Sequence, residues 1–231
     1  AQVFTPDSRR FVLHESALPH GSDKDDPRHR YLVCDLDNGG ALRPITDEIG
    51  VTAPSVSPDG VFLYYFVNET DMGGGRLTLK RVRLDGSDRT TLLVIDGPLP
   101  GTKNGRPSSI YPLSTIRSDG KRLALSCFLG DGQDPAAPWG LLVFDLENPS
   151  IAMTFPLDGT WANLHPQYCR SIDPERKHDL LLQHNHGILR DARGKEIPPV
   201  DLKLIDVHVM RDDGTNLRDM PWGMDGIERC Q

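Results

Sequence analysis

The sequence predicts an all-β chain made of repeated four-stranded antiparallel units, the blades of a β-propeller. Two turn motifs recur in phase along the 231 residues, and short β-rich runs separate them. The chain also holds 22 glycines and 19 prolines, which favours many turns between short strands over long helices. A two-sheet sandwich is the structural alternative, but it does not predict two motifs that repeat in phase.

The first motif is a tight turn built around an aspartate, and we expect it to join strands A and B of each blade. Asp-Gly and related pairs between β-rich runs are typical of β-hairpins. The four copies are Thr5-Pro6-Asp7-Ser8, Ser57-Pro58-Asp59-Gly60, Arg117-Ser118-Asp119-Gly120 and Ser171-Ile172-Asp173-Pro174. The predicted A strands before these turns cover residues 1–4, 51–56, 108–116 and 163–170. The predicted B strands after them cover residues 10–14, 61–67, 122–128 and 178–184.

The second motif is a hydrophobic run followed by a polar turn, and we expect it to be strand C and the turn to strand D. The predicted C strands cover residues 31–36, 79–84, 141–146 and 206–211. Fourth runs such as 90–95 and 151–155 follow them as strand D. Insertions are expected between strands B and C, at 15–30, 68–76 and 129–140, always at the same place in the unit.

The whole chain, residues 1–231, is therefore predicted to be a single β-propeller domain of four visible blades. Propellers usually have more blades, so we expect the ring to be incomplete at both ends, where cut edges would be exposed. A closed four-bladed ring and completion of the ring by another chain are the alternatives.

Composition excludes several classes of partner. The formal net charge is −7 and no basic patch is found, so no nucleic-acid partner is expected. No apolar run approaches the roughly 18 residues that span a bilayer, so no membrane partner is expected. A signal peptide is either absent or already removed, because the chain begins at Ala1 without a basic and apolar leader.

The cysteines show no metal-binding or paired spacing. They are Cys34, Cys127, Cys169 and Cys230, and each lies in a different strand-like run. We expect four free thiols, mostly buried. This usage favours a reducing compartment, and so the cytoplasm over the periplasm or secretion.

The Ser-Pro-Asp-Gly hairpin, together with hydrophobic strands that end in Asp-Leu-Asp-like turns, resembles the TolB-like propeller repeat. The resemblance covers nearly the whole chain. It implies architecture rather than chemistry, because TolB-like blades occur in protein-binding scaffolds, peptidase domains and lyases.

A narrower resemblance starts at Leu164-His165-Pro166-Gln167, just ahead of Asp173. This segment is similar to the metal-binding blade of oligogalacturonate lyases, which are seven-bladed propellers that hold a manganese ion with histidines and a glutamine. The segment departs from the family pattern at Gln167, where the family has a second histidine. The resemblance implies a lyase that cleaves acidic uronate oligosaccharides by β-elimination.

This resemblance implies a divalent metal cofactor, Mn²⁺ above all, and a set of site residues. The implied metal ligands are His165, Gln183, His186 and Gln231. The β-elimination chemistry also needs a base and a cation that holds carboxylates, and we assign these roles to His184 and to Arg106. Lys103 is expected to bind the acidic substrate beside Arg106.

Strand direction gives a further expectation, independent of the family. Because strands A and B are antiparallel neighbours, the start of A, the end of B and the B–C insertions lie at one rim. Six of the eight histidines map to this rim: His14, His20, His29, His165, His184 and His186. Since strand A lines the central channel, His165 is expected to face the axis.

Two other functions remain open. A non-catalytic TolB-like scaffold would bind a protein or peptide at the same rim through aromatic residues, and Trp139, Trp161 and Trp222 lie on or near it. The chain would otherwise be the propeller domain of a peptidase. No Gly-x-Ser-x-Gly motif is present, which disfavours a serine hydrolase within the chain itself.

Overall fold

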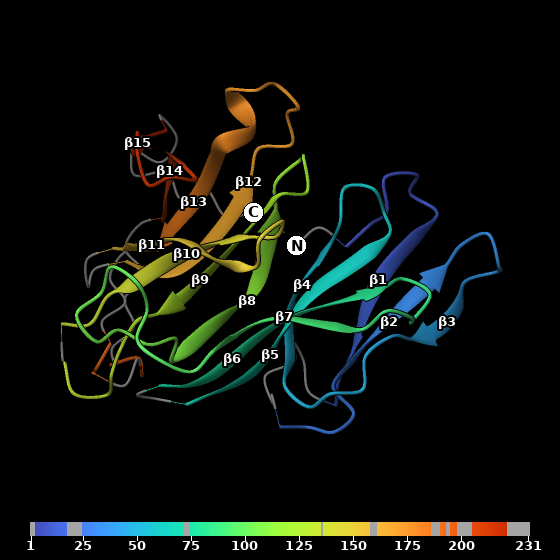
Figure 1. The fold of residues 1–231 in the computed structure, drawn as a ribbon, viewed down its shortest axis with the longest axis horizontal. Helices are drawn as coiled ribbons and strands as arrows, with labels where there is room; N and C mark the ends of the chain where they lie inside the picture. The colour runs from blue at the N-terminus through green and yellow to red at the C-terminus, as the bar shows by residue number, and fades with distance from the viewer. Residues whose placement is uncertain are drawn as a thin grey trace.

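Four antiparallel β-sheets follow one another around an arc, each formed by consecutive strands (Figure 1). The computed structural model describes residues 3–17, 25–71, 74–134, 136–157, 161–185, 190–192, 195–197 and 205–220. Within these residues there is no α-helix, and the one helical turn that they contain is the 3₁₀ turn η2 (Arg176–His178). The predicted all-β propeller architecture is confirmed.

Each sheet corresponds to one predicted blade. The first contains β1 (Arg10–Glu15), β2 (Arg30–Asp35) and β3 (Ala41–Pro44). The second contains β4 (Val51–Val56), β5 (Phe62–Asp71), β6 (Gly74–Arg83) and β7 (Thr90–Ile95). The third contains β8 (Ser109–Ile116), β9 (Arg122–Phe128), β10 (Trp139–Asp145) and β11 (Ser150–Pro156). The fourth contains β12 (Ala162–Tyr168), β13 (Asp179–Asn185), β14 (Ile205–Arg211) and β15 (Arg218–Asp219).

Three of the four predicted A strands are present as β4, β8 and β12. In the first blade, the described part of the predicted strand 1–4 makes only a single bridge, between Phe4 and Phe11, and a hydrogen bond from Val12 N to Val3 O. The first sheet is therefore assigned three strands rather than four.

The Ser-Pro-Asp-Gly sequence closes the A–B hairpin through its own side chains. The Ser57 hydroxyl donates to the Asp59 carboxylate, which accepts the backbone N–H of Val61 at 3.0 Å. Gly60 N donates to Ser57 O, and Gly60 has a φ of 71°, a conformation that glycine adopts without strain. Each residue type of the motif thus has a separate structural role.

The same turns also join successive blades. A Cβ atom added to Gly60 would lie 2.9 Å from Pro6 Cδ, and one added to Gly120 would lie 3.6 Å from Pro58 Cδ. The glycine of one turn therefore lies against the proline of the turn before it. Between the third and fourth turns this contact is replaced by a hydrogen bond from Ser118 Oγ to Ser171 O, 2.6 Å long.

Apolar residues of neighbouring sheets form the core. Val12, Val33 and Tyr65 belong to a cluster between the first and second blades. Phe66 and Phe144, with ring centroids 5.3 Å apart, belong to a cluster between the second and third. Burial of one face of each sheet against the next is the main stabilising contribution of a propeller.

The insertion expected at 68–76 lies between strands B and C, where it extends the two strands. Strands β5 and β6 continue their pairing through this segment, up to Asp71 opposite Gly74. Gly75 makes the close pairing possible, because a Cβ there would lie 2.6 Å from Glu69 O. The segment is a hairpin that lengthens the second blade.

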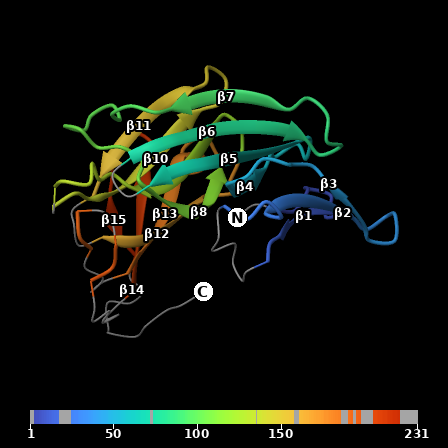
Figure 2. The same cartoon turned by 90° about the horizontal axis from the view of Figure 1, so that it is seen from below.

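Strands β4, β8 and β12 are the inner strands of their sheets, and β8 contacts both β4 and β12 although the three belong to different sheets. Figure 2 shows β7 and β11 on the opposite, outer side of the arc. The buried hydroxyls of Ser55 and Ser114, on β4 and β8, lie 2.8 Å apart. The A strands thus lie on the inner side of the arc, as expected for a propeller.

Cys34, Cys127 and Cys169 are free thiols, as predicted, and Cys230 lies outside the described residues. Cys127 is fully buried, and this burial raises the pKa of its thiol. Among the described residues, no helix has the length and apolar character needed to cross a lipid bilayer.

Candidate functional site

Two cavities lie at opposite ends of the inner side of the arc, which we call the channel. One, the histidine mouth, lies where the A strands start and is lined by His14, His29, Tyr31, Thr52, Pro54 and the segment 111–113. The other, the turn mouth, lies at the A–B turns and has Phe4, Val56, Ser118 and Arg170 among its lining residues. Because β4 starts at Val51 and ends at Val56, the two cavities are at opposite ends of the channel.

The histidine mouth is a cavity of about 450 Å³ with aromatic walls. The ring centroids of His14 and His29 are 4.0 Å apart, and those of His14 and Tyr31 are 5.4 Å apart. Tyr111 enters from β8, and its ring lies 5.7 Å from that of His165 on β12. Side chains from blades that are distant in sequence thus gather at one mouth.

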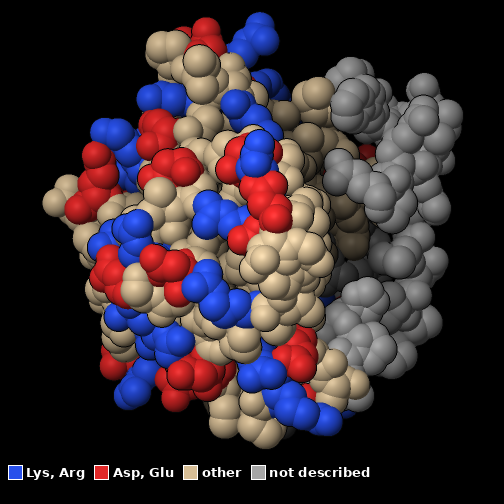
Figure 3. All heavy atoms as spheres, turned by 90° about the vertical axis from the view of Figure 1, so that its right-hand side faces the viewer, with Lys and Arg blue, Asp and Glu red and all other residues tan. Residues whose placement is uncertain are grey.

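None of the residues that line the histidine mouth is an Asp, Glu, Lys or Arg. Partial burial of the imidazole and then the neighbouring His29 lower the pKa of His14 to about 4, so the ring is neutral near pH 7. Burial raises the pKa of Tyr111, which keeps its phenol protonated. The mouth therefore has no charged Asp, Glu, Lys or Arg side chain and a neutral His14, whereas Lys, Arg, Asp and Glu are interspersed over the side of the molecule shown in Figure 3.

His165 and Gln183 lie directly opposite each other on β12 and β13. Both are half-buried, and burial lowers the pKa of His165, so its imidazole is neutral near pH 7. The Gln183 amide donates to Asn185 Oδ1 at 2.9 Å. Two of the four expected metal ligands are thus brought together at the same end of the fourth blade.

The other two expected ligands, His186 and Gln231, lie outside the described residues, as do His20 and Trp222. In the part of the chain that the structure describes, no group of three or more His, Cys, Asp or Glu side chains is arranged to hold a metal ion. Of the four expected ligands, the described residues therefore include one neutral imidazole and one amide.

His184, the expected base, lies on the other face of its sheet. Since Gln183 shares a face with His165, the next residue along β13 points the opposite way. The His184 ring is buried and stacks on Trp161, with centroids 3.8 Å apart and planes 9° apart. This position does not bring the base to His165.

His208 completes this buried aromatic cluster, although its place in the sequence did not assign it to the rim. Its ring centroid is 4.6 Å from that of Trp161, and its Nδ1 lies 2.8 Å from Asp219 Oδ1. Trp139 and Trp161 are also buried. The scaffold hypothesis requires exposed aromatic residues at the rim, and these two tryptophans do not meet that requirement.

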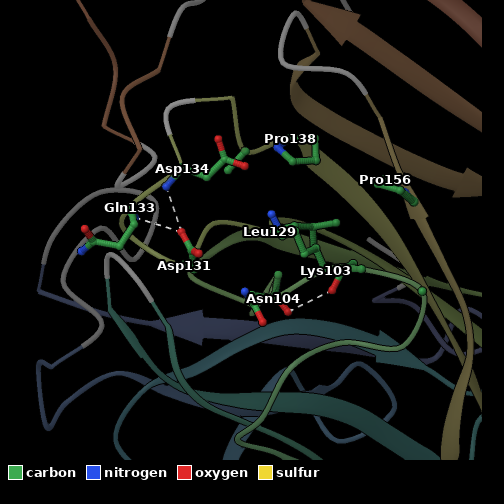
Figure 4. Close-up of a pocket in the computed structure, with 12 residues that line it drawn as sticks. Lys103, Asn104, Leu129, Asp131, Gln133, Asp134, Pro138 and Pro156 are labelled. Atoms are coloured by element: carbon green, nitrogen blue, oxygen red, sulfur yellow. Dashed lines mark hydrogen bonds between the residues drawn. The ribbon is translucent and has the colours of Figure 1, made fainter.

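The two expected substrate-binding cations lie away from the histidine mouth. Arg106 lies against Gly74 at the tip of the β5–β6 hairpin and donates to Asp96 O at 3.4 Å. Lys103 lines a separate cavity of about 540 Å³ in the third blade, beside Asn104 and the B–C insertion (Figure 4). Neither cation lines the cavity that Tyr111 shares with the histidines.

This third-blade cavity is polar on the insertion side. The Asp131 carboxylate accepts the backbone N–H groups of Asp134 and Gln133, each at 2.9 Å (Figure 4). These bonds, and then the charge of Lys103, lower the pKa of Asp131. Leu129, Pro138 and Pro156 form the apolar part of the lining. The cavity thus contains the cation Lys103 and the carboxylate of Asp131, which is hydrogen-bonded to the backbone of its own loop.

Tyr111 and Tyr31 are aromatic residues of the histidine mouth that sequence reasoning missed. The repeat contains the signal: Tyr111 precedes Asp119 by the same number of residues as His165 precedes Asp173. The two residues are therefore equivalent positions on neighbouring A strands.

Comparison with solved structures identifies the architecture. TolB from Acinetobacter baumannii matches with a TM-score of 0.56 and 15% identity, over 95% of this chain and 43% of that one. The chain has a TolB-like β-propeller fold. A TolB-type protein from Agrobacterium tumefaciens matches with a TM-score of 0.55 and 15% identity, over 94% of this chain and 62% of that one.

Peptidases contain the same fold. The acylaminoacyl peptidase from Pyrococcus horikoshii matches with a TM-score of 0.52 and 14% identity, over 91% of this chain and 30% of that one. The chain thus spans less than two thirds of each of these proteins. No protein-family model matches the sequence. No curated protein matches it either. These likenesses establish the fold, and function is argued from the site.

Proposed function

We propose that this chain is a binding scaffold whose histidine mouth binds an uncharged, apolar segment of another protein. The observation that carries the proposal is the uncharged aromatic lining provided by His14, Tyr31 and Tyr111. Aromatic side chains bury a large area in few conformations, and their polar atoms can hydrogen-bond a peptide backbone. Pro54 and Pro112 add rigid apolar surface to the same cavity.

The charge of the mouth favours this proposal over an acidic-saccharide site. A uronate oligosaccharide carries one carboxylate per sugar, and proteins usually bind carboxylates with arginine or lysine. The cations expected for that role, Lys103 and Arg106, do not line the mouth. An uncharged peptide segment needs no such cation.

Fluorescence anisotropy with three labelled peptides tests the proposal. One peptide is rich in proline and tyrosine and uncharged, and the other two carry lysines or glutamates in place of the tyrosines. We expect the uncharged peptide to bind most tightly, and Tyr111→Ala to weaken its binding by about tenfold. Val94→Ala, which removes an exposed apolar side chain from β7, is the matched control and leaves binding unchanged. Equal affinity for all three peptides, or for the Tyr111→Ala variant, would contradict the proposal.

A metal-dependent lyase acting on oligogalacturonate-type substrates is the second candidate function. The observation that favours it is the pairing of His165 with Gln183, a neutral imidazole opposite an amide. If His186 and Gln231 complete the ligand set, the bound Mn²⁺ would acidify the C–H next to a uronate carboxylate. Metal content and ultraviolet absorbance of the unsaturated product should then fall together in His165→Ala. A wild-type protein without manganese after growth in manganese-supplemented medium excludes this candidate.

A further inference from the structure

The turn mouth is built from equivalent positions of the four A–B turns. Counting back from the aspartate of each turn, the residue three positions earlier is Phe4, Val56, Ile116 and Arg170 in blades one to four. The residue one position earlier is Pro6, Pro58, Ser118 and Ile172. Seven of these eight residues line the turn mouth, whereas Ile116 in the third blade is fully buried and does not.

The fourth blade differs from the others at both positions. Arg170 places a cation where the other three blades have an apolar side chain, and Ile172 stands where the first two blades have proline and the third has serine. Departures from a regular repeat are expected where function, rather than packing, selects the residue. Both residues line the cavity of about 330 Å³ at the turn mouth.

Arg170 has the one formal charge among the residues that line this cavity. Its side chain is exposed, and among the described residues it makes no ion pair or hydrogen bond. The aspartates of the third and fourth turns are engaged elsewhere: Asp119 bonds Arg117 and Lys177, and Asp173 accepts the N–H groups of 175 and 176. The cation therefore faces a cavity without a counter-charge.

Apolar surface surrounds the cation. Ile172 is 87% exposed and Phe4 is 58% exposed, and the Phe4 ring also stacks on Phe11 with centroids 5.1 Å apart. The hydroxyl groups of Thr5 and Ser57 are directed into their own turns, to Asp7 and Asp59. The cavity therefore offers one positive charge beside apolar side chains and the hydroxyl groups of serine and threonine residues.

We infer that the turn mouth is a binding site for an apolar group that carries one carboxylate, such as the C-terminal residue of a peptide. The Arg170 guanidinium binds the carboxylate by charge-assisted hydrogen bonds, and Ile172 and Phe4 cover the apolar side chain. The volume suits one or two residues rather than a folded partner. The site is separate from the histidine mouth and does not depend on its function.

Calorimetric titration of the full chain with N-acetyl-Ala-Leu and with its C-terminal amide tests this site. The two probes differ only in the carboxylate. We expect the acid to bind with a Kd of about 1 mM or below, and the amide about tenfold more weakly or worse. Acetate, which lacks the apolar group, is also expected to bind more weakly than the acid. Equal binding of acid and amide, or no binding of the acid at millimolar concentration, overturns the inference.

Three variants assign the effect to the cavity. Arg170→Gln should lose the preference for the acid, and Arg170→Lys should keep part of it because the charge remains. Arg176→Gln removes an exposed arginine at the same end of the molecule, outside the cavity lining, and should bind like wild type. Unchanged preference in Arg170→Gln, or an equal loss in Arg176→Gln, overturns the assignment. Hexanoate is a further probe in the same titration. If it binds as tightly as the dipeptide acid, the site is supported, and its ligands are apolar monocarboxylates in general.

Discussion

Arg117 Nη1 donates to Asp212 Oδ2 over 2.8 Å, across the boundary between the third and fourth blades. Both side chains are 8% exposed. The same guanidinium bonds both oxygens of Asp119. Burial alone would raise the pKa of Asp119, but the hydrogen bonds from Arg117, Lys121 N and Lys177 outweigh it and hold that pKa well below its usual range.

Replacing Arg117 by Met should therefore destabilise the fold by about 2–4 kcal/mol, because Asp212 is left buried without its cation. Urea denaturation followed by tryptophan fluorescence measures this change. The control is Arg9→Met, which breaks the exposed ion pair with Asp37 and should cost less than about 1 kcal/mol. Equal effects of the two substitutions would show that the Arg117 network contributes no more than a surface pair.

The contact between Gly60 and Pro6 predicts a cost for a methyl group in the second turn. Gly60→Ala should destabilise the protein by about 1–3 kcal/mol, from its positive φ and from the clash with Pro6 Cδ. Gly86→Ala is the matched control, since Gly86 also has a positive φ but no atom within 4 Å of the added Cβ. Its cost should be smaller. If both variants lose the same stability, the contact between Gly60 and Pro6 does not contribute to the cost of the substitution.

The lowered pKa of His14 predicts a dependence of stability on pH. The pKa is about 4 in the folded chain and near 6.5 when unfolded, so the unfolded state binds more protons between these values. Stability should therefore fall as the pH is lowered from 7 to 4. His14 is exposed on one side, so solvent screening limits the loss to about 1 kcal/mol. Urea denaturation at each pH measures the free energy of unfolding. Between pH 7 and pH 4 the wild-type protein should lose about 1 kcal/mol more of this free energy than His14→Gln does. Parallel curves of unfolding free energy against pH for the two proteins would refute the prediction.

The three described cysteines should differ in reactivity. The test uses a Cys230→Ser variant, which leaves these three thiols. Cys169 is half-buried, so it should react with a thiol reagent in the native state. Cys34 and Cys127 are buried, so they should not react. In denaturant without reductant, all three should react. A denatured count of one thiol would show that two of them are paired.

The repeat made most of the fold predictable. The aspartate turns and the hydrophobic C strands place β4, β9 and β10 within a few residues of their observed bounds, because hairpin chemistry is local to each turn. The 68–76 insertion was not predictable in the same way. Whether two strands continue to pair beyond a turn depends on close backbone approach, which Gly75 allows, and not on hydrophobic pattern.

The site was predictable only in part. The cross-strand position of His165 and Gln183 follows from strand direction, and so does the rim position of His14 and His29. The burial of His184 beneath Trp161 does not follow, since the residue that covers a strand comes from a different segment. Tyr111 and Arg170 carry a signal in the repeat, but its meaning appears only when equivalent positions meet around the channel.

The sequence by itself therefore determined the architecture: four successive antiparallel units, their turns, and the end of each blade at which a residue lies. These properties depend on interactions within a few residues or between adjacent strands. Only the tertiary structure decided which side chains share a mouth, which are buried between blades, and that the two mouths differ in charge. The reason is that each channel wall is assembled from several A strands more than fifty residues apart, whose relative placement is fixed by packing between blades.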